Sequence, residues 1–311
     1  MPKWTVEEDM PDQTGRLVIV TGANSGLGYE TTLALAKKNA TVLMACRNLD
    51  KAETARQQII DQVPGADLRI MKLDLGSLES VHTFAEEVRQ GYTHIDILYN
   101  NAGVMAIPRR ETADGFEMQF GVNHLGHFAL TGLLLDCLID VPESRIVTVT
   151  SFASYNGRID FDDLHGEQRY TRYGAYSQTK VANLLFGLEL HRRLREAEAQ
   201  TASIVAHPGY AHTDLQSTST SASGNLVERI TYGILNNVLA QSAQMGALPQ
   251  LYAATDPDAE SGKLYGPHLR IRGYPSEERP VKYARSEDVA RRLWEVSEEL
   301  TGVRYAFAVP A

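Results

Sequence analysis

The sequence predicts an α/β fold: a single doubly wound domain in which a mostly parallel, seven-stranded sheet has helices on both faces. Short apolar runs rich in β-branched residues, such as Leu17-Val18-Ile19-Val20, alternate along the chain with helical stretches of ten or more residues. Helices of that length form crossover connections, which make neighbouring strands parallel and cover both faces of the sheet. The composition does not change abruptly along the chain, which favours one domain over two.

The predicted elements follow one another regularly. Strands are expected over 17–22, 41–46, 68–73, 95–100, 145–150 and 203–206, because each is a short apolar run bounded by turn residues. Helices are expected over about 26–38, 50–62, 77–90, 115–138 and 173–198. The second of these helices is expected to be capped by Asp50.

The two ends of the predicted domain differ in character. Residues 1–15 are polar and acidic, so we expect a lead-in to a domain over 16–311. The stretch 216–224 is rich in Ser, Thr and Gly and follows the sixth strand, which favours a substrate-side lid over about 210–245. A plain linker is the alternative.

Composition excludes several classes of function. A net charge of −9 and a pI near 5.5 argue against nucleic acid or an anionic membrane as partner. Cys46 and Cys137 are too few for a disulfide framework or a metal cluster, so we expect no metal and a reducing compartment. No apolar run approaches the ~20 residues of a membrane-spanning helix. We therefore expect a cytoplasmic protein.

A glycine-rich turn joins the first strand to the first helix. In Gly22-Ala23-Asn24-Ser25-Gly26-Leu27-Gly28, the first glycine permits a tight turn, the second lets backbone N–H groups approach a pyrophosphate, and the third allows close helix–strand packing. The helix N-terminus adds partial positive charge. The turn predicts a dinucleotide site in a Rossmann-type domain; a structural turn without ligand is the alternative.

Further motifs occur at ordered places along the chain. They are Asn100-Asn101-Ala102-Gly103 after the fourth strand, Asn123 in the fourth helix, Ser151 at the end of the fifth strand, Tyr176-Ser177-Gln178-Thr179-Lys180 in the fifth helix, and Pro208-Gly209 with Thr213 after the sixth strand. With the glycine turn, they resemble the short-chain dehydrogenase/reductase family over residues 15–266. The segment Asn123-His124-Leu125-Gly126-His127-Phe128 and the long spacing from Ser151 to Tyr176 resemble its retinol dehydrogenase and protochlorophyllide reductase branch. The membrane segment of many retinol dehydrogenases is absent, so a retinoid substrate is not implied.

The resemblance implies a catalytic set of Asn123, Ser151, Tyr176 and Lys180. Tyr176 and Lys180 lie one helical turn apart, and we expect the ammonium group to lower the tyrosine pKa toward the range where acid–base catalysis works. By resemblance, Lys180 also binds the nicotinamide ribose, Ser151 binds the substrate oxygen, and Asn123 holds a water. The alternatives are a solvated Tyr/Lys pair, a strand-end Ser151 with Ser154 as the active hydroxyl, and an Asn123 bonded to its own helix.

The end of the second strand indicates which cofactor is bound. NAD enzymes of this fold place a carboxylate there, whereas this chain has Cys46-Arg47-Asn48, and a guanidinium suits a 2′-phosphate. The prediction is NADP, with NAD possible and a surface role for Arg47 as the alternative. The expected cofactor-binding residues are Gly22, Asn24, Ser25, Gly26, Leu27, Gly28, Arg47, Asn48, Asp74, Leu75, Asn101, Ala102, Gly103, Tyr176, Lys180, Pro208, Gly209 and Thr213.

Substrate selection is expected from Met105-Ala106, residues 152–170, Tyr210 and residues 216–244, whose apolar and aromatic side chains favour a hydrophobic carbonyl or alcohol. The resemblance implies a homodimer or homotetramer paired through the fourth and fifth helices. His124 and His127 favour packing or subunit contact over catalysis. Two other functions stay open: an extended sugar-nucleotide epimerase, and a cofactor sensor without turnover.

Overall fold

The computed structural model describes residues 3–210 and 241–307, and within them one eight-stranded sheet. Its strands are β1 (Leu17–Thr21), β2 (Thr41–Cys46), β3 (Leu68–Lys72), β4 (Ile97–Asn100), β5 (Arg145–Val149), β6 (Ala202–Ala206), β7 (Leu264–Pro267) and β8 (Pro275–Glu278). The order is β3-β2-β1-β4-β5-β6-β7-β8, and only the β7–β8 pair is antiparallel. The predicted doubly wound α/β class is confirmed, with an additional antiparallel strand at one edge. Thr213 and most of the expected lid lie outside the described residues.

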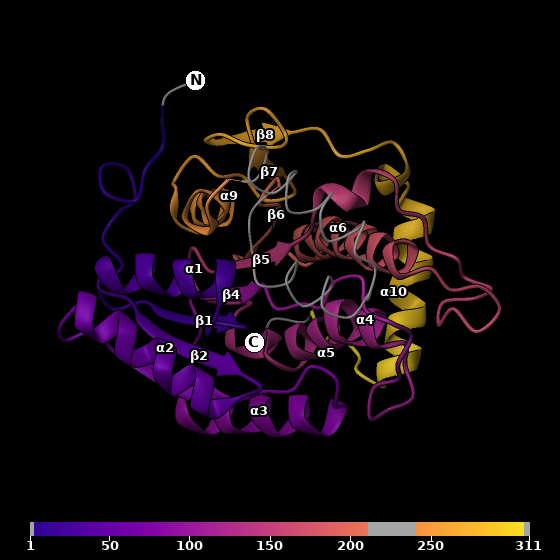
Figure 1. Ribbon diagram of the computed structural model, residues 1–311, viewed down its shortest axis with the longest axis horizontal. Helices are drawn as coiled ribbons and strands as arrows, with labels where there is room; N and C mark the ends of the chain where they lie inside the picture. Colours follow the sequence, from indigo (N-terminus) through magenta and orange to yellow (C-terminus); the bar gives the residue numbers. More distant parts are fainter. Residues whose placement is uncertain (1–2, 211–240, 308–311) are drawn as a thin grey trace, which may run out of the picture.

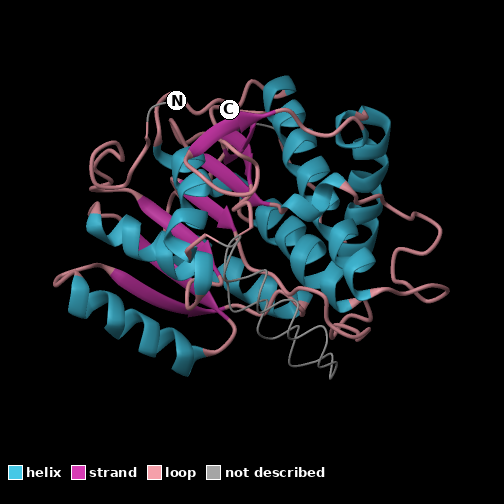
Figure 2. Ribbon diagram, turned by 45° about the horizontal axis from the view of Figure 1, so that its top comes forward, coloured by secondary structure: helices cyan, strands magenta, loops and turns pink. Residues whose placement is uncertain are grey.

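Helices cover the sheet on both sides (Figures 1 and 2). They are α1 (Gly26–Lys37), α2 (Leu49–Gln62), α3 (Leu78–Gly91), α4 (Met118–Phe120), α5 (Gly126–Leu133), α6 (Arg172–Glu196), α9 (Ala243–Thr255) and α10 (Glu287–Thr301). One hydrophobic layer packs α1, α2 and α9 on the sheet, and another packs α3, α5, α6 and α10 on its opposite face.

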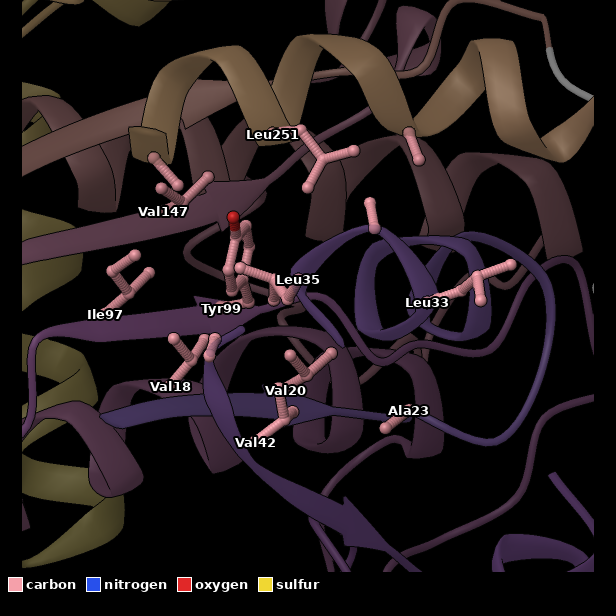
Figure 3. Packing of buried hydrophobic residues seen from close by; sticks show 14 of the residues in the cluster. Val18, Val20, Ala23, Leu33, Leu35, Val42, Ile97, Tyr99, Val147 and Leu251 are labelled. Atoms are coloured by element: carbon pink, nitrogen blue, oxygen red, sulfur yellow. The ribbon is translucent and has the colours of Figure 1, made fainter. Parts of the chain in front are cut away.

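Strand alternation explains why both layers are apolar. In β1, Val18 and Val20 face the α1/α9 layer, whereas Leu17 and Ile19 face the other layer. Figure 3 shows the first of these layers, with side chains from the central strands meeting Leu35 of α1 and Leu251 of α9. A sheet buried on both faces needs near-continuous apolar strands, which is the pattern that made these strands recognisable.

The expected continuous helix over 115–138 is wrong. Gly115 has a φ of +83°, and the helix begins only at Met118, where the Glu117 carboxylate caps it. A short π-helix over Gly121–Leu125 then separates α4 from α5. A Cβ on Gly126 would lie 2.5 Å from the Leu75 carbonyl oxygen, so this segment packs at backbone distance on the loop after β3. Close packing at this glycine accompanies the change from α- to π-geometry.

Two local expectations also need correction. Asp50 does not cap α2: Asn48 does, its side chain accepting from the Lys51 N–H at 2.8 Å, and Asp50 lies in the first turn. The lead-in is packed where it is described. Trp4, Val6 and Met10 are buried, and the Trp4 indole donates to Asp256 at 2.7 Å. Apolar residues spaced within the acidic stretch thus attach it to the end of α9.

The C-terminal helix α10 packs on α5 and α6 (Figure 1). Its Trp294 ring lies 5.1 Å from Phe128 of α5, 5.8 Å from Phe186 of α6 and 4.5 Å from Tyr305. His124 lies 2.9 Å from the Ser297 hydroxyl of α10, so its contact is within the chain. The chain's own C-terminal helix therefore occupies the aromatic face of the two helices that were expected to pair with a second copy.

Candidate active site

The expected site residues gather at the carboxyl ends of the central strands. β1 and β4 are neighbours at the point where the strand order reverses, which is where ligands bind in open α/β sheets. A cavity of about 890 Å³ opens there. It is lined by Gly22, Asn24, Ser25, Gly26, Leu27, Gly28, Ala45, Arg47, Asn48, Lys51, Thr54, Ala55, Gln58, Leu73, Asp74, Leu75, Asn101, Ala102, Gly103, Val104 and Val122.

The glycine turn has the shape of an anion cradle. Gly22 and Gly26 adopt φ values of +68° and +52°, which disfavour residues with a side chain. A Cβ on Gly28 would lie only 2.2 Å from the Gly22 carbonyl oxygen. Within the described chain Ser25 gives α1 no side-chain cap, so the N–H groups of its first turn are available to a phosphate. These features fit a dinucleotide pyrophosphate.

The segment after β4 lies between this turn and the expected catalytic residues. Backbone N–H groups of Asn101 and Ala102 donate to the Thr21 hydroxyl at 2.9 and 3.0 Å, and the Asn101 amide donates to the Thr21 carbonyl at 2.8 Å. A Cβ on Gly103 would lie 3.7 Å from the Lys180 ammonium. The segment therefore lines the wall between the glycine turn and Lys180.

The structure brings Ser151, Tyr176 and Lys180 close together. Tyr176 and Lys180 lie on α6 and are buried, with exposed fractions of 7% and 4%. The Ser151 side chain lies close enough to the Tyr176 hydroxyl to lower the pKa of that hydroxyl. The Lys180 ammonium lies 5.7 Å from the Tyr176 ring centre and donates to the Val149 carbonyl at 3.3 Å. The alternative of a solvated Tyr/Lys pair is therefore wrong.

The expected lowering of the Tyr176 pKa does not occur. Burial raises the pKa of Tyr176 to about 12, although the nearby Ser151 side chain opposes that shift. Burial also lowers the pKa of Lys180 to about 8. Removal from water disfavours phenolate and ammonium alike, and at Tyr176 this effect is larger than any effect of the neighbouring ammonium.

Asn123 lies within the short π-helix, and its side chain bridges the loop after β4 and helix α6. Its side chain accepts from the Val104 N–H at 2.7 Å and donates to the Val104 carbonyl at 2.9 Å and to the Thr179 hydroxyl at 3.0 Å. The alternative, in which the Asn123 side chain bonds to the backbone of its own helix, is therefore wrong. Asn123 thus joins the loop after β4 to α6 beside Lys180.

The far end of the cavity is basic. Arg47 and Asn48, two of the expected cofactor-binding residues, line it, and sequence reasoning missed Lys51, Thr54 and Gln58 of α2. Their helical spacing is the signal that could have found them, since residues three and four apart share a helix face. Asp74 and Leu75 close the adjacent wall, where the Asp74 carboxylate accepts from the Gly76 N–H at 3.0 Å.

Pro208 and Gly209 follow β6 on the other side of Ser151. Gly209 has a φ of +65°, and a Cβ there would lie 2.4 Å from the Ile271 carbonyl oxygen. They do not line the 890 Å³ cavity, and neither do Ser151, Tyr176 and Lys180. The described site therefore has a deep nucleotide end and a separate cluster of polar groups beyond Gly103.

The family model for short chain dehydrogenases matches residues 16–224. The chain belongs to the short-chain dehydrogenase family. It is 41% identical to human retinol dehydrogenase 13 over 291 residues, covering 93% of this chain and 85% of that protein. It is also 41% identical to mouse retinol dehydrogenase 11, over 93% of this chain and 87% of the other. The resemblance to the retinol dehydrogenase branch is confirmed.

Solved structures agree with this assignment. A crystal structure of an uncharacterized protein from Mycobacterium Paratuberculosis is 40% identical, with a TM-score of 0.81, over 98% of this chain and 100% of that one. A Shigella flexneri short chain dehydrogenase complexed with NADP, 20% identical, has a TM-score of 0.64 over 82% of this chain and 97% of its own, which shows the shared fold. This short-chain dehydrogenase is an oxidoreductase acting on alcohol or carbonyl groups. In its described residues no helix is long and apolar enough to span a membrane.

Proposed function

We propose that this short-chain dehydrogenase transfers a hydride between NADP(H) and a hydrophobic carbonyl or alcohol. The observation that supports this most directly is the cluster of half-buried Ser151 with buried Tyr176 and Lys180, which lies just beyond the cavity at the glycine turn. If Tyr176 and Lys180 were only a surface pair, or if the glycine turn were only structural, there would be no reason to bury a tyrosine and a lysine at that edge of the sheet. Burial of both groups has a cost in stability that a catalytic role explains.

The residues of the cavity, together with the turn after β6, share the proposed cofactor contacts. The α1 N-terminus and the glycine turn would hold the pyrophosphate, and Asp74 and Leu75 would border the adenine. Arg47 and Lys51 would pair with a 2′-phosphate, which favours NADP over NAD. Asn101, Ala102, Gly103, Pro208 and Gly209 would border the nicotinamide end. The bound cofactor supplies the hydride; the protein orients it and handles the proton.

Tyr176 is the proposed proton donor. Because burial keeps its pKa at about 12, the hydroxyl carries its proton at neutral pH and can give it to an alkoxide as that forms. Ser151 would hydrogen-bond the same oxygen and stabilise its charge. Lys180 would hold the nicotinamide ribose, and Asn123 would fix the loop after β4 next to it. This arrangement favours carbonyl reduction near pH 7 over alcohol oxidation.

The proposed substrate is hydrophobic. The exposed Phe152 ring, next to Ser151, lies 5.0 Å from the Tyr155 ring, so aromatic surface borders the polar cluster. The names of the relatives add retinol and retinal to the compounds worth testing. We also propose that residues 16–311 act as one domain in the cytoplasm. A homodimer or homotetramer stays a prediction, and it would need a face other than the one that α10 covers.

A turnover screen tests this proposal and its rivals. NADPH oxidation would be followed at 340 nm with nonanal, benzaldehyde, cyclohexanone and all-trans-retinal, using wild type and Tyr176→Phe. We expect turnover of at least one compound by wild type and a loss of about a thousandfold in the variant, at the magnitude of acid–base catalysis. NADPH binding without turnover would support a sensor. Turnover of Tyr176→Phe within a few-fold of wild type would overturn the assignment of the proton donor.

A further inference from the structure

A buried polar network lies behind the chemical end of the site. His207, between β6 and Pro208, has an exposed fraction of 1%. Its Nδ1 accepts from the Gly209 N–H at 3.1 Å, so in the neutral ring the proton is on Nε2. Nε2 lies 3.0 Å from Oε1 of Glu278, the last residue of β8, and donates to it. The contacts of His207 therefore fix one tautomer and connect Gly209 to Glu278.

The second carboxylate oxygen of Glu278 accepts from the Tyr155 hydroxyl. Tyr155 ends the short 3₁₀-helix Phe152–Tyr155, which begins directly after Ser151 and is capped by the Ser151 side chain. One carboxylate thus joins the segment that carries Ser151 to the turn that contains Gly209. Both segments border the polar cluster. Among the described residues, Glu278 itself makes no hydrogen bond to Tyr176 or Lys180.

The surrounding packing makes this arrangement specific. A Cβ on Gly266 of β7 would lie 2.2 Å from His207 Nε2 and 2.3 Å from Glu278 Oε1, so only glycine lets the two groups meet across β7. Burial raises the pKa of Glu278, but the hydrogen bonds from His207 and Tyr155, together with the positive charges of a protonated His207 and of Arg270, outweigh that effect and leave the pKa lowered. Glu278 is therefore a carboxylate that accepts two hydrogen bonds.

We propose that Glu278 is a positioning residue, which sets the placement of Ser151 and of the Pro208–Gly209 turn through Tyr155 and His207. This inference rests on the proposed function, because it assigns these two segments to the substrate oxygen and the nicotinamide end. Edge strand β8 would then contribute to catalysis from behind the site. If the hydrogen bonds of Glu278 were purely structural, they would stabilise the β7–β8 edge of the sheet without affecting turnover by the folded protein.

Glu278→Gln separates the two possibilities. The amide has the size of the carboxylate but only one acceptor oxygen, so His207 and the Tyr155 hydroxyl can no longer both donate to residue 278. We expect kcat to fall about tenfold, with KM for the carbonyl and Kd for NADPH within about threefold, as for a lost alignment rather than lost binding. Tyr155→Phe on this background should add little, because the remaining amide oxygen then serves His207 alone.

The neighbouring Glu277 offers a matched control. It lies on the same strand and pairs with Lys263 at 2.8 Å, but on the surface. Glu277→Gln should keep kcat within about twofold of wild type, as expected for an exposed pair. Hydrogen–deuterium exchange gives a second readout that needs no substrate: segments 151–157 and 203–210 should exchange faster in Glu278→Gln and not in Glu277→Gln.

Each outcome decides between the proposals. The positioning role would be overturned if Glu278→Gln kept the kcat and the hydrogen exchange of wild type, or if kcat fell equally in Glu278→Gln and Glu277→Gln. It would also be overturned if the fall in kcat matched the fraction of unfolded protein. Should Glu278→Gln fail to fold, Tyr155→Phe alone should lower kcat about threefold, at the scale of one lost hydrogen bond, and an unchanged kcat would refute the inference. An active Tyr176→Phe would instead refute the proposed function, whatever Glu278 does.

Discussion

The proposed preference for NADPH would depend on two cations that line the far end of the cavity, Arg47 and Lys51. Both side chains are exposed, so solvent screens them, and we take the lower end of the range for charge-assisted contacts. At about 1.5 kcal/mol each, Arg47→Gln and Lys51→Gln should each lower kcat/KM for NADPH about tenfold. The double variant should approach a hundredfold loss and remove most of the preference over NADH.

The assay compares kcat/KM for NADPH and NADH in wild type, both single variants and the double variant. Efficiency with NADH should change less than about threefold, because its ribose has no 2′-phosphate to lose a partner. The NADPH preference of wild type should also fall as salt is raised, since exposed charges are screened within about 10 Å at 0.1 M. Arg56→Gln is the control: Arg56 lies on the same helix but pairs with Glu53 and does not line the cavity.

Several results would refute this reasoning. Equal efficiencies with both cofactors in wild type would mean that nothing at this end recognises the phosphate. A double variant that still prefers NADPH at least tenfold would place recognition elsewhere, with Ser25 of the glycine turn the next candidate. Equal losses with NADPH and NADH would show that the two cations support the fold of the pocket rather than the 2′-phosphate.

Three further predictions test the site and the packing around it. Because burial lowers the pKa of Lys180 from 10.5 to about 8, the unfolded chain binds more protons between these pH values, and the folded state is penalised below pH 8. Lys180→Met should therefore lose activity, yet its free energy of unfolding at pH 7 should rise by up to about 3 kcal/mol. Thermal melts at different pH should show this gain shrinking to nothing above pH 10.5. An unchanged melting temperature at pH 7 would argue against a buried ammonium. Gly28→Ala places a Cβ 2.2 Å from the Gly22 carbonyl, so it should lower stability by about 1–3 kcal/mol and abolish measurable NADPH binding in a fluorescence titration; near-normal affinity would argue against this turn geometry. Trp294→Ala removes the centre of the aromatic layer under α10 and should cost about 3–5 kcal/mol in denaturant unfolding while folded protein keeps its kcat; a loss below 1 kcal/mol would mean that α10 is only loosely attached.

Local patterns in the sequence were sufficient to predict most of the fold and to name the residues of the proposed site. Buried parallel strands are short apolar runs, so β1 through β6 were recognisable without any tertiary information. The glycine turn was recognisable because a φ above zero and a close backbone approach each demand glycine at a defined position. Tyr176 and Lys180 could be paired because four residues make one helical turn.

The tertiary structure decided what depends on neighbours distant in sequence. Packing of Gly126 on the loop after β3 accompanies the interruption of the expected long helix. Burial from all sides raised the pKa of Tyr176 against the expected effect of Lys180. The α10 layer on α5 and α6, and the link from Glu278 to Ser151 and Gly209, join segments more than 65 residues apart. Secondary structure follows from residues within a few positions of one another, whereas desolvation, close packing and hydrogen-bonded networks depend on which distant residues the fold brings together.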